Sequence, residues 1–270
     1  MANVFKILYY IFATKTLSIS RLTLFWNYLT IKFKTIGNSR SPATISLLGK
    51  KFTGADFFTL QYLYQEVFLK SEYHFRTKSA KPIIIDCGSN VGMAIYFFKK
   101  IYPDSHILGF EANPEVFKIL QENIQGLGLS QVKVNNLALF NQNTEISFFT
   151  GNSNESLLGS IHSKRGGQKE VKVKAVKLSD YLLEFDEVDL IKIDVEGAEW
   201  KILEDLIESK TLRKAKQYLI EFHLNLPGMK EQMSDFLKYF EENGYVYNIR
   251  GEFGTVSEFQ DLLIHCYRKD

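Results

Sequence analysis

From Lys81 onward, short apolar runs alternate with stretches that carry apolar residues at helical spacing, and this alternation constrains the fold most. The first run, residues 83–85, is three consecutive isoleucines, as is typical of a parallel strand buried on both faces. Strands that alternate with helices form a parallel sheet through right-handed crossovers. We therefore expect an α/β domain over residues 76–270.

The periodicity predicts the order of the elements in this domain. The expected strands are residues 83–85, 106–110, 132–139, 146–149, 171–176, 190–195, 218–222, 245–249 and 262–267. The expected helices are residues 90–101, 114–124, 197–207 and 230–242. The second of these has Asn113 as its expected N-cap. Residues 146–149 and 171–176 are expected to pair across a polar loop, residues 151–169.

Residues 1–75 lack this alternation, and we expect a separate helical segment there. Two or three helices are expected, with breaks near residues 37–42 and 49–54, where glycine and proline gather. Within residues 56–70, the following apolar residues recur at helical spacing and predict a packing face: Phe57, Leu60, Leu63, Tyr64, Val67 and Phe68.

The charge of the chain is unevenly distributed. The first 55 residues carry +8 and the remainder −6, although the net charge is only +2. The basic residues of this segment are Lys6, Lys15, Arg21, Lys32, Lys34, Arg40, Lys50 and Lys51. Such a segment is attracted to an anionic surface, so we expect peripheral contact with a membrane or with a charged glycolipid. Packing on the α/β domain, or a dimer contact, is the alternative.

Other sequence features indicate a cytoplasmic protein. No run of 18 apolar residues occurs, so no segment is expected to span a bilayer. The apolar run at residues 7–13 lacks a small-residue cleavage site, which disfavours a signal peptide. Cys87 and Cys266 each sit inside an apolar run, as buried thiols of a reducing compartment do.

A glycine-containing loop, residues 86–92, follows the first predicted strand and opens a helix. Gly88 and Gly92 allow a tight turn and a close approach of a ligand to the backbone. A dinucleotide site has the pattern G-x-G-x-x-G, and Asn90 stands here in place of its second glycine. Asp86 would repel phosphate and suits the ammonium group of a methionine moiety. For the loop alone, a structural turn is the alternative.

Glu111 ends the second predicted strand, 25 residues after Asp86. A carboxylate at this position can accept hydrogen bonds from both ribose hydroxyls of a nucleoside. An exposed strand-end acid is the alternative for Glu111 alone. The loop and the acid together predict a nucleoside site at the carboxyl edge of the sheet.

Further polar residues follow two later strands. Asp194 lies at the end of the strand at residues 190–195, and Glu196 and Glu199 follow it. The last two could simply be acids favoured in a first helical turn, but an unpaired carboxylate at Asp194 would be costly. These acids are expected to orient a substrate, with a divalent cation as the alternative. His223 follows the next strand and can reach the same edge, unless it is an ordinary polar residue.

Four segments of the chain resemble the FkbM family of class I methyltransferases: residues 84–92, 110–114, 136–139 and 192–199. The sequence Asp-Val-Glu-Gly-Ala-Glu at residues 194–199 is the most specific part, because the glycine loop is shared by all class I enzymes. The similarity runs from about Tyr62 to the end of the sequence. The resemblance therefore implies nothing about residues 1–61.

The resemblance implies a Rossmann-like class I methyltransferase fold, whose seven-stranded sheet is parallel except for its last strand. It also implies S-adenosylmethionine as cofactor and O-methylation, often of a sugar or a natural product. The residues expected to bind the cofactor are Asp86, Gly88, Ser89, Asn90, Gly92, Glu111, Ala112, Asn113, Asn136, Ala138 and Asp194. No metal is expected in the site.

An alcohol acceptor must lose its proton as the methyl group is transferred, and a base could assist. His223 is the expected base, with Glu196 or Asp194 as alternatives. The acceptor is expected to be a small molecule or a glycan. Nucleic acid fits poorly, because methylation of adenine typically uses an Asn/Asp-Pro-Pro-aromatic run and neither cysteine is placed for cytosine chemistry. A nicotinamide-dependent oxidoreductase and a cofactor- or glycan-binding module without turnover stay as alternatives.

Overall fold

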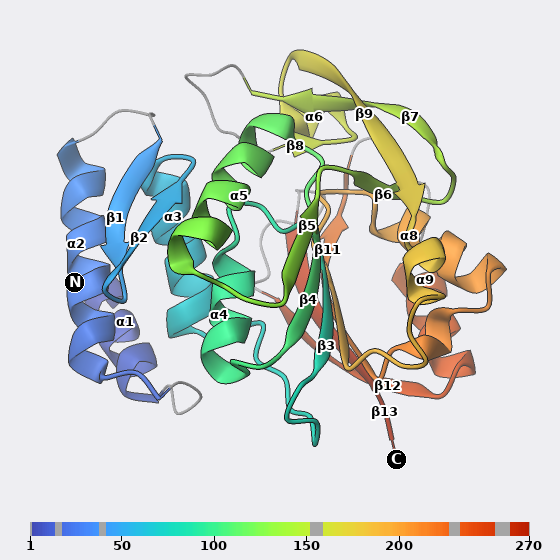
Figure 1. The fold of residues 1–270 in the computed structure, drawn as a ribbon, viewed down its shortest axis with the longest axis horizontal. Helices are drawn as coiled ribbons and strands as arrows, with labels where there is room; N and C mark the ends of the chain where they lie inside the picture. Colours follow the sequence, from blue (N-terminus) through green and yellow to red (C-terminus); the bar gives the residue numbers. More distant parts are fainter. Residues whose placement is uncertain are drawn as a thin grey trace.

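The computed structural model describes residues 2–13, 18–37, 42–151, 159–226, 233–251 and 260–269. Its centre is a seven-stranded sheet with the order β12-β13-β11-β10-β3-β4-β5 (Figure 1). The strands are β3 (Ile83–Cys87), β4 (His106–Phe110), β5 (Val132–Asn135), β10 (Leu190–Ile193), β11 (Gln217–Leu224), β12 (Tyr245–Gly251) and β13 (Gln260–Arg268). The last strand, β13, runs antiparallel to both its neighbours, and the other pairs are parallel. The expected Rossmann-like topology is confirmed.

Helices cover both faces of this sheet. One face packs against α4 (Met93–Ile101) and α5 (Pro114–Leu127), and the other against α7 (Leu178–Leu182), α8 (Glu199–Glu208) and α9 (Met233–Glu242). Successive residues of β3 alternate between the two sides, because Ile84 belongs to the first hydrophobic cluster and Ile85 to the second. As expected, Asn113 caps α5 by accepting from the N–H groups of Glu115 and Val116.

The order of the strands reverses beside β3. From β3 the chain passes outward to β4 and β5, and it returns to form β10 on the other side of β3. The carboxyl ends of β3 and β10 therefore border the crevice in which open α/β sheets bind their ligands.

The predicted strand at residues 132–139 is two strands in two different sheets. Its first half is β5 in the main sheet, whereas β6 (Ala138–Phe140) belongs to a second sheet with the order β6-β9-β7-β8. The other strands of this sheet are β7 (Thr144–Thr150), β8 (Gly159–Ser160) and β9 (Lys169–Lys177). The pairing of β7 with β9 is antiparallel, as expected. The predicted loop at 151–169 contains β8 and the short helix α6 (Ser163–Gly166), while residues 152–158 lie outside the described ranges.

The N-terminal segment contains more than helices. Its elements are α1 (Ala2–Ala13), α2 (Arg21–Gly37), β1 (Ala43–Leu47), β2 (Lys50–Gly54), α3 (Phe57–Tyr64) and a π-helical turn (Gln65–Leu69). The hairpin β1–β2 was not predicted, since Gly49 was interpreted as a helix break. Gly49 instead forms the turn of the hairpin, with φ = +78°, and residues 43–47 alternate between buried and exposed. Lys15 and Arg40 lie outside the described residues.

This segment packs on α4 and α5 in one continuous hydrophobic cluster. The ring of Phe68 contacts those of Tyr96 and Phe97 of α4, at centroid distances of 6.0 and 5.6 Å. Asn123 of α5 accepts from the Thr53 N–H and donates to the Thr53 carbonyl. The expected packing face of residues 56–70 is confirmed at its centre, where Leu60, Tyr64, Val67 and Phe68 are buried.

Candidate active site

A pocket lies where the crevice was expected, at the carboxyl ends of β3, β4 and β10 and under the second sheet. Six of the residues expected to bind a cofactor line it: Gly88, Asn90, Glu111, Ala112, Ala138 and Asp194. Glu196, one of the alternative bases, lines it as well. The pocket therefore brings together side chains from four separate stretches of the sequence.

Gly88 lets two parts of the backbone approach each other. Its φ is +83°, and a Cβ at this position would lie 1.7 Å from the carbonyl oxygen of Asp194. A Cβ at Gly92 would similarly lie 2.8 Å from a methyl carbon of Leu120. From the sequence, Gly88 was expected to allow the close approach of a ligand. In the structure it allows the loop after β3 to approach the end of β10.

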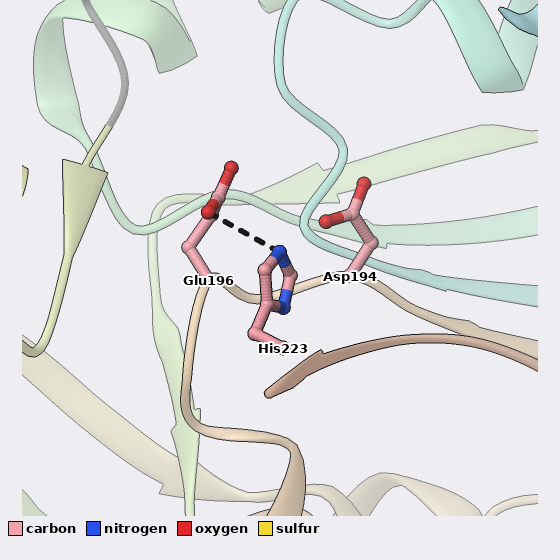
Figure 2. Close-up of side chains that lie close together, drawn as sticks. All are labelled: Asp194, Glu196 and His223. Atoms are coloured by element: carbon pink, nitrogen blue, oxygen red, sulfur yellow. Dashed lines mark ion pairs between the residues drawn. The ribbon is translucent and has the colours of Figure 1, made fainter. Parts of the chain in front are cut away.

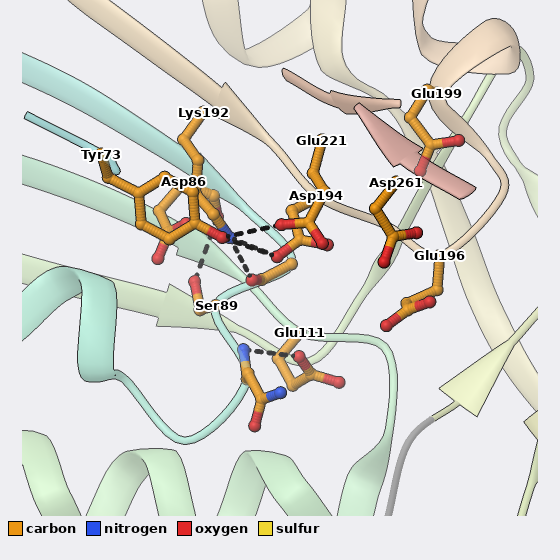
Figure 3. Close-up of polar contacts among 12 residues, drawn as sticks. Tyr73, Asp86, Ser89, Glu111, Lys192, Asp194, Glu196, Glu199, Glu221 and Asp261 are labelled. Atoms are coloured by element: carbon orange, nitrogen blue, oxygen red, sulfur yellow. Dashed lines mark hydrogen bonds and ion pairs between the residues drawn. The ribbon is translucent and has the colours of Figure 1, made fainter. Parts of the chain in front are cut away.

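Glu111 is held by the backbone at the wall of the pocket. Its Oε2 accepts from the N–H of Asn90 at 2.8 Å (Figure 3). Its Oε1 accepts from the N–H of Asn113, also at 2.8 Å. Burial raises the pKa of Glu111 to about 7, although these two N–H groups lower it. Each carboxylate oxygen can accept a second hydrogen bond. The side chain is therefore fixed in an orientation that can accept from two adjacent hydroxyls.

Lys192 is a buried cation beneath the glycine loop. Its Nζ donates to the Gly88 carbonyl at 2.8 Å and lies 3.3 Å from both Asp86 Oδ1 and Asp194 Oδ2. Burial lowers the pKa of Lys192, but the two carboxylates outweigh this effect and raise it. Asp86 is fully buried against this cation. It thus lies beneath the loop, and not at the pocket wall where an ammonium group of a ligand was expected to contact it.

The remaining residues expected to bind a cofactor support the walls of the pocket. Ser89 is buried and donates to the Asp86 carbonyl, and Asn113 caps α5. Asn136 donates to the carbonyl groups of Glu111 and Ala112, at the point where the chain passes from the first sheet to the second. These side chains hold the residues that line the pocket.

Tyr73 reaches this network from the N-terminal segment. Its hydroxyl lies 3.2 Å from Asp194 Oδ2 and 3.1 Å from Glu221 Oε2, and its ring lies over Lys192 (Figure 3). Burial and the nearby Asp194 raise the pKa of Glu221 to about 8. Tyr73, Lys192 and Glu221 were not predicted as site residues from the sequence. A signal existed for the last two, because each is a charged residue inside an apolar strand and requires a buried partner.

His223 is completely buried, and both of its ring nitrogens face carboxylates. Nδ1 lies 2.8 Å from Glu199 Oε1, and Nε2 lies 3.3 Å from Glu196 Oε2 (Figure 2). Asp261 Oδ1 lies 3.7 Å from Nε2. Burial lowers the pKa of His223, but Glu199 and Glu196 raise it well above its ordinary value. An imidazolium cannot accept a proton, so this environment argues against the expectation that His223 is the general base.

Glu196 stands at the pocket wall in a strained backbone conformation. Its φ of +55° lies in the left-handed region, which residues other than glycine rarely adopt. The Ser160 hydroxyl donates to the Glu196 carbonyl at 2.5 Å, and the Gly197 N–H donates to Glu199 Oε1 at 3.0 Å. Such strain persists only where surrounding contacts impose it, and it gathers at functional sites.

Two overlapping groups of side chains have the composition of a cation site. Asp194, Glu196 and His223 offer ligand atoms within 4.8 Å of one another, and so do Glu221, His223 and Asp261. Both groups share His223. In its protonated form, His223 supplies the positive charge that balances these carboxylates, and it then has no lone pair to offer a cation.

Comparison with known proteins gives a consistent result. A sequence model of the methyltransferase FkbM domain matches residues 86–247. Methyltransferase sdnD of Sordaria araneosa is 30% identical over 179 residues, which cover 55% of this chain and 69% of that protein. The 2-O-methyltransferase NoeI of Sinorhizobium fredii is 26% identical over 138 residues, which cover 45% of this chain and 56% of that protein.

A solved structure shares the fold. The crystal structure of methyltransferase FkbM from Methylobacillus flagellatus superimposes with a TM-score of 0.51 at 13% sequence identity. The match covers 98% of this chain and 60% of that one. The chain therefore spans less than two thirds of that protein and of NoeI.

Proposed function

The chain belongs to the FkbM methyltransferase family, and from this premise we propose that it methylates a hydroxyl oxygen of a sugar, a glycan or glycolipid, or a natural product. As a member of this family, the chain is an enzyme that uses S-adenosylmethionine as methyl donor. The oxidoreductase and the non-catalytic binding module are therefore not kept as alternatives. Membership does not extend to the oxygen acceptor or to the roles of single residues, which we propose.

One observation carries the proposal: a single pocket has Glu111 on one wall and the carboxylates of Asp194 and Glu196 on another. Glu111 has the geometry to bind the ribose of the cofactor. The carboxylate of Glu196 suits an acceptor that must lose a proton, as a hydroxyl does. The name of the relative NoeI, a 2-O-methyltransferase, supports an oxygen acceptor.

We assign the role of base to Glu196 in place of His223. Glu196 lines the pocket with a side chain that is 20% exposed, whereas His223 is fully buried behind it. His223 and Glu199 then orient Glu196 through the chain of contacts at 3.3 and 2.8 Å. Asp194 lines the pocket together with Gly88 of the glycine loop and is assigned to the ammonium group of the cofactor.

In this mechanism the bound cofactor supplies an electrophilic methyl group on a sulfonium. With the cofactor bound, the walls of the pocket would position the acceptor oxygen against that group and would exclude water, and positioning of this kind can contribute about 7–11 kcal/mol. As the new C–O bond forms and the C–S bond breaks, the hydroxyl proton passes to Glu196. The leaving thioether is neutral and needs no acid.

The test is a screen with S-adenosylmethionine and matched acceptors. Sugars, lipid-linked saccharides and natural-product alcohols are each offered beside an analogue in which an amine replaces the hydroxyl. Mass spectrometry should find a gain of one methylene on the hydroxyl compound, and the Glu196→Gln variant should lose that product. Methylation of the amines alone would contradict the assignment of an oxygen acceptor.

A further inference from the structure

Helix α2 has two apolar faces, of which only one is covered in the part of the chain that the structure describes. Leu24, Tyr28 and Ile31 are buried against the rest of the N-terminal segment. The second face is a stripe of residues at a spacing of four, seven and three, which keeps them on one side of a helix. Its members and their exposed fractions are Leu22 (69%), Trp26 (63%), Phe33 (69%) and Ile36 (77%). A surface helix normally presents polar side chains on its outer face, so this stripe requires an explanation.

Exposed apolar side chains are concentrated in the same part of the molecule. Among the described residues, 11 large apolar side chains are exposed, and eight of them lie between residues 9 and 62. Those outside α2 are Tyr9 and Phe12 of α1, and Phe58 and Tyr62 of α3. Figure 1 shows α2 at the left edge of the molecule, away from the seven-stranded sheet. Exposed apolar side chains gathered in this way on one segment mark an interaction site.

The charged residues of α2 and of the hairpin beside it are all positive. Lys32 and Lys34 precede and follow Phe33, so they point about 100° to either side of the stripe. Arg21 begins the helix, and Lys50 and Lys51 lie in the hairpin packed beside it. The first acidic residue of the sequence is Asp56. Any partner of this face must therefore be apolar at its centre and anionic at its rim.

We propose that the outer face of α2 docks on an anionic membrane surface, with the helix lying in the plane of the interface. Tryptophan, phenylalanine and leucine on one side with flanking lysines are the composition of such helices. The helix has 17 residues and is about 25 Å long. No helix among the described residues is long and apolar enough to cross a membrane. A second copy of the chain fits less well, because a twofold interface would bring the same cations together.

The proposal is tested by sedimentation of the full chain with vesicles. One set contains phosphatidylcholine alone, and the other a mixture of phosphatidylcholine and phosphatidylserine. The chain should sediment with the anionic set, and raising the salt from about 0.05 M to about 0.5 M should release it. The double variant Trp26→Ser, Phe33→Ser should bind at least about tenfold more weakly, since two apolar anchors are lost.

A matched control uses an exposed apolar residue far from α2. Leu183 is 69% exposed, so Leu183→Ser makes the same kind of change and should leave vesicle binding unaltered. Circular dichroism checks that each variant is folded. Equal sedimentation with both vesicle sets, or unchanged binding of the double variant, would overturn the proposal. So would a dimer in lipid-free solution that the double variant converts to monomer, since that result assigns the face to a second copy.

Discussion

At the scale of single residues, the protonation state of Glu111 determines how many hydrogen bonds it can accept from a nucleoside. A carboxylate accepts hydrogen bonds from both ribose hydroxyls, whereas a protonated carboxyl offers less acceptor capacity. With a pKa of about 7, Glu111 is mainly ionised at pH 8 and mainly protonated at pH 6. Its capacity to bind a nucleoside is therefore expected to change within the physiological range.

We predict that affinity for S-adenosylmethionine rises about tenfold from pH 6 to pH 8, because the ionised fraction of a carboxyl group with a pKa of about 7 rises about tenfold over this interval. Glu111→Gln should remove this pH dependence and weaken binding at pH 8 by about 1.5–3 kcal/mol, the range for a hydrogen bond to a charged group. Isothermal titration calorimetry measures both. The comparison of the two proteins at each pH removes the effect of titration of the cofactor's own amine. Parallel pH profiles would remove Glu111 from the ribose site.

A second prediction separates Glu196 from His223. Glu196→Gln should lower turnover by about 10²–10⁴-fold with cofactor affinity nearly intact, as expected when a general base is lost. His223→Gln should instead act mainly on stability, by about 3–5 kcal/mol, because it leaves the buried Glu199 without its cation. Turnover at saturating acceptor and thermal unfolding give the two readouts. A folded His223→Gln protein with the larger turnover loss would return the role of base to His223.

At the scale of elements, the N-terminal segment supports the site through Tyr73. The tyrosine hydroxyl donates to Asp194, directly after β10, and to Glu221 within β11, and its ring covers Lys192. Tyr73 lies before residues 86–247, which the family model matches. The segment therefore contributes a side chain to the site as well as a hydrophobic surface to the core.

Tyr73→Phe keeps the ring and removes the hydroxyl. If Asp194 holds the ammonium group of the cofactor, loss of this donor should weaken S-adenosylmethionine binding by about tenfold, the equivalent of one hydrogen bond of about 1.4 kcal/mol. The control is Tyr102→Phe, whose hydroxyl donates to the Phe75 carbonyl, away from the pocket. Equal affinities for the two variants would show that the Tyr73 hydroxyl has no part in cofactor binding.

Elements that local sequence patterns determine could be predicted, whereas those that depend on contacts between distant residues could not. Local patterns determine β3, β4 and α5, so their positions were predicted from apolar runs, a proline and a capping asparagine. The division of residues 132–139 between two sheets depends on contacts that Asn136 makes with residues 24 and 25 positions earlier. Side-chain roles were harder to predict for the same reason. His223 was placed at the correct edge, but its carboxylate partners come from α8 and β13, as well as from Glu196.

At the scale of the whole molecule, buried acids link stability to pH. Burial raises the pKa of Glu72 to about 9, of Glu221 to about 8 and of Glu111 to about 7, all above the ordinary value for glutamate. A group whose pKa is raised by folding binds its proton more tightly in the folded state. It therefore contributes stability below its unfolded pKa and loses that contribution as the pH rises through the folded value.

We accordingly expect the melting temperature of the ligand-free protein to fall between pH 6 and pH 9. His223 acts in the same direction, because its pKa is also raised by folding. Differential scanning calorimetry across this range measures the slope. Glu72→Gln should flatten the upper part of it, since that side chain stays neutral. A melting temperature that rises with pH would mean that these carboxyl groups are ionised in the folded protein.

At Asn136 the chain passes from the first sheet to the second, and this division of the pocket between two sheets affects how the enzyme can evolve. The walls built from β3, β4 and β10 carry the residues that the cofactor requires, whereas Ala138, Phe148 and Gly159 of the second sheet line the other side. Mutations that reshape the second sheet can thus accumulate without disturbing the residues that bind the common methyl donor. Descendants of one ancestral enzyme could in this way diverge in acceptor while they retain the same donor.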